Sequence, residues 1–151
     1  MLKTKIPPPL YMVIFGVLMY FLAKNYPIMV LLEAPVNNIA YGFAGLALLL
    51  DLSALFLFFR SKTTPNPIKP ENANQVVTKG MYRVSRNPMY LGLLFWLIAW
   101  AIHLSVLSPF LLLPLFVWVI NVQQIIPEER VLEKKFGKSY LNYKNKVRRW
   151  L

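Results

Sequence analysis

Cysteine is absent from this sequence, and histidine occurs only once, as His103. Without cysteine the chain can form no disulfide, no thiolate metal site and no cysteine nucleophile. A single histidine likewise excludes a metal site built from several imidazoles. We therefore expect no bound metal ion.

Charge is also scarce, and acidic charge is the scarcest: 6 Asp and Glu stand against 17 Lys and Arg, a net charge of +11. Such an excess can indicate nucleic-acid binding. The basic residues, however, lie in segments that flank long apolar runs, where they can face anionic lipid and set the topology. We expect membrane lipids, and no nucleic acid, as partners.

Apolar residues are abundant, at 57% of the 151 residues with a mean hydropathy of +0.47. They form four blocks, at residues 7–23, 36–59, 88–102 and 106–126. About 20 apolar residues cross a hydrocarbon core as a helix, so the third block is short for a full span and would need tilt or local thinning. The pattern predicts a single all-α domain, an integral membrane helical bundle of about four transmembrane helices.

Two polar segments carry most of the positive charge. Residues 60–87 contain six Lys and Arg, and residues 127–151 contain eight. The positive-inside rule places both segments and both termini in the cytosol. The domain then consists of two N-terminal spans (1–59), a cytosolic loop (60–87), a helical hairpin (88–126) and a cytosolic C-terminal segment (127–151).

The C-terminal segment is polar but patterned. We take Pro127 as the end of the fourth apolar block, and apolar and tyrosine side chains then recur at helical spacing up to Tyr143. This spacing predicts a short amphipathic helix on the cytosolic membrane surface, broken at Gly137.

The stretch "RNPMYLG", Arg86 to Gly92, lies where polar sequence gives way to the third block. Asparagine is a favoured N-cap residue and proline is favoured at the first helical position, so Asn87 and Pro88 predict a helix start. The same residues could instead form one wall of a binding site. His103 lies on the opposite side of the membrane in this topology, so we do not expect it to act as a general base.

Polar side chains inside the apolar blocks are a second group of candidates. Asp51 lies within the second block, and an intramembrane carboxylate is a functional hypothesis by default. Asn121 lies at a similar depth in the fourth block. We take both as candidate substrate contacts and expect Asp51 to bond an amide of Asn121, Gln123 or Gln124. A purely structural helix–helix contact is an equal alternative.

The "PEER" sequence, Pro127 to Arg130, places two of the six acids side by side. Acids in a first helical turn complement the helix dipole, which is a structural explanation. Adjacent helical positions point in different directions, so Glu128 and Glu129 cannot share one partner. We expect one of the two carboxylates to face a pocket.

Four motifs occur in order: T-x-G-x-Y-R at 78–83, R-N-P-x-Y-x-G at 86–92, E-E-x-x-L at 128–132 and F-G-x-x-Y-x-x-Y at 136–143. Together they resemble the isoprenylcysteine carboxyl methyltransferase and phospholipid methyltransferase superfamily of integral membrane enzymes. The resemblance covers residues 74–150, and the first two blocks match only in being hydrophobic.

The resemblance implies S-adenosylmethionine as methyl donor and a lipophilic acceptor delivered from the bilayer. It implies positioning roles for Arg86, Asn87 and Glu128, and a substrate contact at Gln124. It places the donor against Asn74, Gln75, Val76, Val77, Tyr82, Asn87, Pro88, Met89, Tyr90 and Glu128.

Two departures from the superfamily leave the acceptor open. The isoprenylcysteine enzymes usually have histidine where this chain has Asn87, and an arginine where it has Gln124. The acceptor could be an isoprenylcysteine-like carboxylate, a lipid amine or another hydrophobic small molecule. A steroid-reductase-like membrane enzyme that uses NADPH, and a non-catalytic membrane scaffold or lipid-binding protein, are the alternatives.

Overall fold

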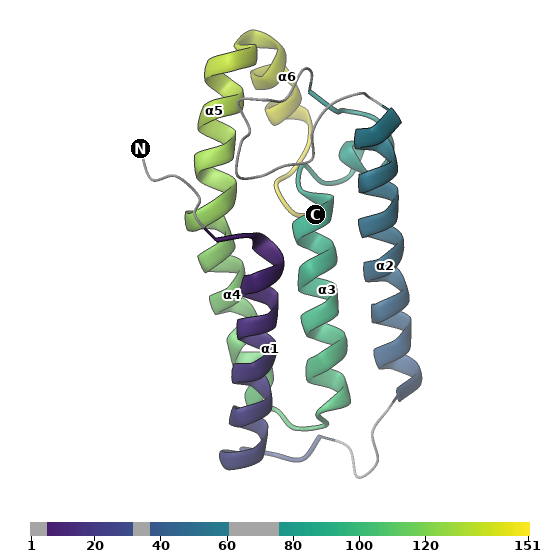
Figure 1. Cartoon of the computed structure of the whole chain (residues 1–151), viewed down its shortest axis with the longest axis vertical. Helices are drawn as coiled ribbons and strands as arrows, with labels where there is room; N and C mark the ends of the chain where they lie inside the picture. Colours follow the sequence, from purple (N-terminus) through teal and green to yellow (C-terminus); the bar gives the residue numbers. More distant parts are fainter. Residues whose placement is uncertain (1–5, 32–36, 61–75) are drawn as a thin grey trace.

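The computed structural model describes residues 6–31, 37–60 and 76–151, and within these ranges it contains helices and no strand (Figure 1). The helices are α1 (Pro8–Asn25), α2 (Asn37–Arg60), α3 (Pro88–His103), α4 (Leu112–Ile120), α5 (Ile126–Phe136) and α6 (Lys138–Lys146). Shorter turns are η2 (Gly80–Arg83), η3 (Ser108–Leu111) and the π-helical turn η4 (Asn121–Ile125). The all-α prediction is confirmed for these residues.

Three helices are long and apolar enough to cross a membrane: Pro8–Asn25, Asn38–Leu57 and Ser108–Phe136. The third apolar block forms α3, which has 16 residues and is roughly 24 Å long. In Figure 1, α3 lies in the middle of the bundle and packs against α1, α2 and α4. That α3 is itself a fourth span stays a prediction.

Pro127 was taken as the end of the fourth apolar block, but the helix formed by this block does not end there. The helix runs from Ser108 to Phe136 without a break. A proline inside a helix removes one backbone hydrogen bond and crowds the carbonyl four residues earlier, here that of Gln123. The chain widens into the π turn η4, Asn121–Ile125, at that place. This wider turn provides the room that the proline ring needs. The break expected at Gly137 is present, since φ is 51° there.

The two ends of the bundle differ in composition. The end of α2, the start of α3, the helices α5 and α6 and the C-terminus lie together at one end (Figure 1), which we call the polar end. The end of α1, the start of α2 and the 103–108 turn lie at the other end. There the backbone N–H groups of Leu31 and Leu107 bond the carbonyls of Ser105 and Met29, so the chain after α1 is fastened to that turn.

Two clusters of buried side chains hold the helices together. One joins α1, α3 and the fourth helix through Phe15, Met19, Tyr90, Leu97, Phe116, Ile120 and Ile125. The other lies at the polar end and joins α2, η2 and α6 through Ala54, Val77, Tyr82, Tyr140 and Tyr143. Met89, at the start of α3, packs against the second cluster, which therefore brings the C-terminal segment against the start of α3.

Asp51 bonds a different partner from the one predicted. Trp96 Nε1 on α3 donates to Asp51 Oδ2 at 3.1 Å, whereas Asn121 and Gln124 bond elsewhere. The carboxylate lies directly over Gly92: a Cβ built at that glycine would lie 2.2 Å from Asp51 Oδ1. Gly92 therefore permits the close approach of α2 and α3, and Asp51 acts as a helix–helix contact.

The substitution Gly92→Ala tests this contact. The new methyl group must displace the carboxylate and break its bond to Trp96, so we expect a loss of about 1–3 kcal/mol in the free energy of unfolding. Thermal melts in detergent would measure it. Trp96→Phe should cause a similar loss, and the double variant should lose little more, because both changes remove the same bond. Gly45→Ala is the matched control, since a Cβ there meets nothing within 4 Å. Additive losses would contradict the shared bond.

Candidate functional site at the polar end

The start of α3 is held by the end of the chain. We call residues 147–150 the C-terminal strap. The backbone N–H of Arg86 donates to the carbonyl of Arg148 at 2.9 Å. Asn87 Nδ2 and Ser85 Oγ both donate to the carbonyl of Arg149, at 3.0 and 3.3 Å. Helix α3 begins at Pro88, as predicted. The Asn87 side chain makes no capping bond, and its amide holds the strap instead.

Trp150 continues the strap into the bundle. Its ring packs against the core cluster of α1, α3 and α4, and its Nε1 donates to Asn121 Oδ1 at 3.2 Å. Asn121 lies in the π turn η4. This candidate substrate contact is therefore bonded to the strap, and the strap links the π turn to the start of α3.

Glu129 is the centre of a cluster of cations. Its carboxylate meets Arg86 Nη2 at 3.1 Å, Arg149 Nη2 at 2.8 Å and Lys144 Nζ at 3.7 Å. Arg149 Nε also donates to Glu129 Oε1, at 3.2 Å. These hydrogen bonds to Glu129 raise the pKa of Arg149. The cluster joins α5, α6, the strap and the segment before α3.

Arg86 is almost fully buried and only partly bonded. Its side chain is 8% exposed, and that of Glu129 is 6% exposed. Arg86 Nη2 contacts the carboxylate of Glu129. The Nε and Nη1 atoms of Arg86 are buried and have no hydrogen-bond partner among the described residues. Buried donors are normally bonded, so these N–H groups are suited to an anionic group of a ligand.

Glu128 points away from Glu129, toward α3. Tyr90 Oη donates to Glu128 Oε1 at 2.5 Å. The two adjacent carboxylates thus have separate partners, as expected from their positions on one helix. Tyr90 and Glu128 come from the second and third motifs and bring α3 and α5 into direct contact.

A group of tyrosines surrounds these residues. Tyr143 Oη donates to the carbonyl of Tyr82 at 2.7 Å. Burial raises the pKa of Tyr82, and the nearby Tyr143 and Glu128 raise it further. Burial also raises the pKa of Tyr140 and of Tyr143, while Arg86 partly opposes both shifts. All three phenols therefore stay neutral at physiological pH and can donate hydrogen bonds.

Gln124 lies one helical turn from Glu128, on the same helix. Residues four apart share a face, so both side chains approach the same side of the bundle. Gln124 Nε2 donates to the carbonyl of Ile6 at 2.8 Å, while its Oε1 is buried and has no hydrogen-bond partner among the described residues. A π turn such as η4 is frequent at functional sites.

The structure brings together most of the residues predicted from the sequence. Val76 and Met89 pack against the cluster that contains Val77 and Tyr82. Pro88 is buried at the start of α3. Asp51 bonds Trp96 and does not join the amides of the fourth helix. Asn74 and Gln75 lie outside the described residues, so their predicted donor contacts are not tested.

Several residues of this site were not selected from the sequence. They are Arg149, Trp150 and the tyrosines Tyr140 and Tyr143, while Glu129 was considered only as the neighbour of Glu128. The two tyrosines belong to the F-G-x-x-Y-x-x-Y motif, whose presence was a usable signal. Nothing in the local sequence pairs Arg149 with Glu129, 20 positions away, or Trp150 with Asn121, 29 positions away.

Comparison with known proteins identifies a family. Residues 36–139, more than half of the chain, match the family model described as phospholipid methyltransferase. No solved structure matches the chain.

Three curated proteins are similar to parts of the chain. A Haemophilus influenzae protein described as uncharacterized is 51% identical over 63 residues, which is 42% of this chain and 100% of that protein. Protein-S-isoprenylcysteine O-methyltransferase B of Arabidopsis thaliana is 28% identical over 74% of the chain and 57% of its own length. The Schizosaccharomyces pombe protein-S-isoprenylcysteine O-methyltransferase is 32% identical over 72% of the chain and 46% of its own length.

The chain spans about half the length of these two methyltransferases. The family match includes α2, α3, α4 and α5, together with the Tyr90–Glu128 contact and the buried Gln124. On this match, and on the order of the four motifs, the chain belongs to the phospholipid methyltransferase family.

Proposed function

We propose that this protein is a membrane-embedded methyltransferase that uses S-adenosylmethionine and methylates a lipophilic acceptor. The observation that carries the proposal is the Tyr90–Glu128 hydrogen bond at the polar end. It joins the second and third of the four motifs at the end of the bundle where Arg86 and Gln124 have buried, unbonded polar atoms.

The residues at the polar end suit the chemical groups of this donor. The Glu128 carboxylate can accept hydrogen bonds from ribose hydroxyls, and the free N–H groups of Arg86 can donate to a carboxylate. Val77, Met89 and Tyr82 offer an apolar and aromatic wall for adenine. When bound, the donor supplies a methyl group on a positively charged sulfur.

The protein's own contribution is positioning. Displacement of a methyl group from sulfur needs an aligned nucleophile and exclusion of water more than a dedicated base. The Glu129 cluster and the C-terminal strap fix the start of α3 relative to α5. They thereby fix Tyr90 and Glu128 relative to each other, which is the pre-organisation that such a reaction requires.

The side chain of Gln124 indicates which chemical group the acceptor carries. Its Nε2 is bonded to Ile6, which leaves the carbonyl oxygen Oε1 as the buried atom in need of a partner. A carbonyl oxygen accepts hydrogen bonds and cannot bond a carboxylate. The acceptor proposed here is therefore a lipid with an N–H or O–H group, a lipid amine in particular, rather than an isoprenylcysteine carboxylate.

The orientation proposed for the protein follows from charge. The polar end carries the Lys and Arg residues of α5, α6 and the strap, and the positive-inside rule places such residues in the cytosol. Four spans, with α3 as the shortest, then put the donor site at the cytosolic surface. There a water-soluble donor and a membrane-dissolved acceptor can both reach it.

Calorimetry on the purified protein in detergent tests this function. We expect S-adenosylhomocysteine, the product form of the donor, to bind in the micromolar range and NADPH to give no heat of binding. Incubation with labelled donor and extracted lipids, followed by mass analysis, would then identify the methylated product. NADPH binding would support a reductase instead, and binding of neither ligand would support a non-catalytic membrane protein.

A further inference from the structure

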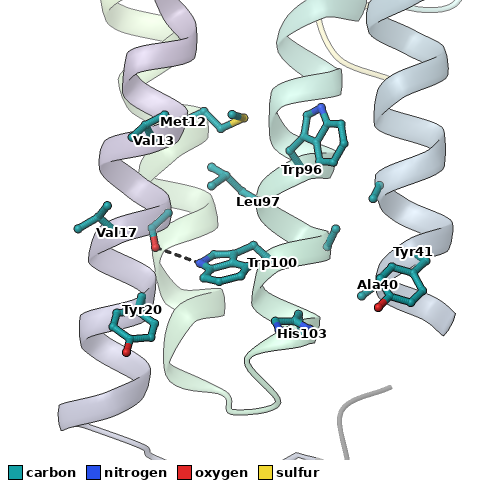
Figure 2. A pocket seen from close by; sticks show the side chains of 13 residues that line it. Met12, Val13, Val17, Tyr20, Ala40, Tyr41, Trp96, Leu97, Trp100 and His103 are labelled. Atoms are coloured by element: carbon teal, nitrogen blue, oxygen red, sulfur yellow. Dashed lines mark hydrogen bonds between the residues drawn. The ribbon is translucent and has the colours of Figure 1, made fainter. Parts of the chain in front are cut away.

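A large groove lies in the other half of the bundle, away from the polar end (Figure 2). Its volume is about 600 Å³, within the range of sites for small molecules and cofactors. Helices α1, α2 and α3 form its three walls. Its lining is almost entirely apolar and includes Gly16, Tyr20, Ala40, Ala44, Trp96 and Trp100.

This groove is separate from the proposed donor site. Its lining on α3 runs from Trp96 to His103. Tyr90 precedes Trp96, the nearest lining residue on α3, by six residues, a distance of roughly 9 Å along the axis. Neither Tyr90 nor Glu128 lines the groove.

The groove opens between two helices that have the length and composition of membrane spans. Val13 and Val17 of α1 are 54% and 49% exposed, and Tyr41 of α2 is 66% exposed. Small residues on α2 and α3 leave the space open. Trp100 Nε1 donates to the carbonyl of Gly16 at 3.0 Å and ties α1 to α3 across it (Figure 2). Because apolar side chains of two candidate spans surround the mouth, an occupant can enter from the bilayer.

The wall contributed by α1 ends in a cation. Val13, Gly16, Val17 and Tyr20 line the groove at spacings of three and four residues, so they share one face of the helix. Lys24 follows Tyr20 by four residues and lies on that face, in the last turn of α1. The apolar stripe therefore leads to a positive charge at the end of the helix, where a membrane surface would lie.

We propose that this groove binds a glycerophospholipid, with one acyl chain between α1, α2 and α3 and its phosphate beside Lys24 and Tyr20. The apolar lining complements the chain, and the lysine complements the phosphate. The bound lipid has its head at the end of the bundle opposite Glu128, so it is not the acceptor in its reacting position. It is a second lipid site, and it stands whether or not the protein is a methyltransferase.

Photo-crosslinking tests the site directly. The full-length protein is reconstituted in vesicles of phosphatidylethanolamine and phosphatidylglycerol, with a small fraction of phosphatidylglycerol that carries a diazirine on its acyl chain. After illumination, labelled peptides are mapped by mass spectrometry. We expect labelling at Ala44, Trp96 and Val13 to saturate with probe concentration. Labelling at Leu49, whose side chain is 65% exposed, should rise in proportion to the probe concentration.

Two glycines provide a matched pair of variants. A Cβ added at Gly16 or at Gly42 meets nothing within 4 Å, so both positions accept a larger side chain. Gly16 lines the groove, whereas Gly42 does not. Gly16→Leu should fill the groove and remove the saturable labelling, and Gly42→Leu should retain it. Lys24→Gln should weaken competition by unlabelled phosphatidylglycerol by about fivefold, the effect of one interfacial lysine.

Saturable labelling that survives Gly16→Leu would overturn the proposal, as would labelling of the groove that never saturates. A groove that stays unlabelled at every probe concentration would overturn it as well. Binding of S-adenosylhomocysteine to Gly16→Leu provides the check on folding. The affinity of Gly16→Leu for this ligand should match that of Gly42→Leu. If neither variant nor the parent binds the ligand, circular dichroism spectra of the variants serve as the check on folding.

Discussion

Replacing Glu129 by glutamine is expected to lower the free energy of unfolding by about 3–5 kcal/mol. The glutamine keeps the size of the side chain but removes the charge that faces Arg86, Arg149 and Lys144. Arg86, 8% exposed, would then be a buried cation without a counterion. Thermal melts in detergent would measure the loss, and limited proteolysis should cleave the released C-terminal strap first.

Glu133→Gln is the matched control for this substitution. Glu133 is also an acid on α5 and also pairs with Lys144, but about a third of each side chain is exposed. Such pairs contribute about 1 kcal/mol or less. If Glu129→Gln and Glu133→Gln proved equally stable, the Glu129 cluster would not hold the polar end together.

A double variant separates stability from ligand binding. Replacing a buried ion pair by apolar side chains of similar size is often neutral, so Glu129→Leu with Arg86→Met should recover most of the lost stability. It should not recover binding of S-adenosylhomocysteine if the free N–H groups of Arg86 hold the carboxylate of this ligand. Recovery of both would assign Arg86 a structural role only.

The parts of the fold that were predictable are those determined by local sequence. Long apolar blocks predicted α1, α2 and the fourth helix, because a helix needs about 20 apolar residues to cross a bilayer. Pro88 determines the start of α3, since proline suits a first helical position. Gly137 predicted the break before α6, because glycine readily adopts the positive φ found there.

Long-range contacts were not predictable in the same way. An aspartate inside a span requires a partner, but the sequence does not specify how α2 is rotated against α3. Asp51 meets Trp96 because Gly92 lets the two helices approach closely. Pro127 was taken as the end of the fourth apolar block, and the π turn that lets the helix continue past this proline has no distinct sequence signal.

Individual residues of the candidate site were predicted from the sequence, but the hydrogen bonds and ion pairs that connect them were not. The motifs indicated Tyr90 and Glu128 separately, and the structure joins them with one hydrogen bond. The strap was missed because Arg149 contributes mainly its backbone carbonyl to Asn87, and any residue type has such a carbonyl. Side-chain patterns carry no information about contacts of this kind.

Glu128→Ala is expected to weaken binding of S-adenosylhomocysteine about 100-fold or more while the protein still inserts and folds. The carboxylate has two oxygens, and one of them accepts from Tyr90. In the proposed site it also accepts from the hydroxyls of the ligand, and bonds to a charged acceptor contribute about 1.5–3 kcal/mol each. Losing two of them corresponds to a factor of about 100 or more in Kd, which calorimetry in detergent measures directly.

Tyr90→Phe separates the contribution of the Glu128 carboxylate from that of its hydrogen bond with Tyr90. Phenylalanine keeps the ring in the core of α1, α3 and α4 but removes the hydroxyl that orients Glu128. We expect a loss of roughly tenfold in affinity, since the carboxylate remains and only its orientation is freed. If Glu128→Ala and Tyr90→Phe melted at lower temperatures but bound the ligand as the parent does, Glu128 would be a structural link between α3 and α5. The donor site would then have to lie elsewhere in the bundle.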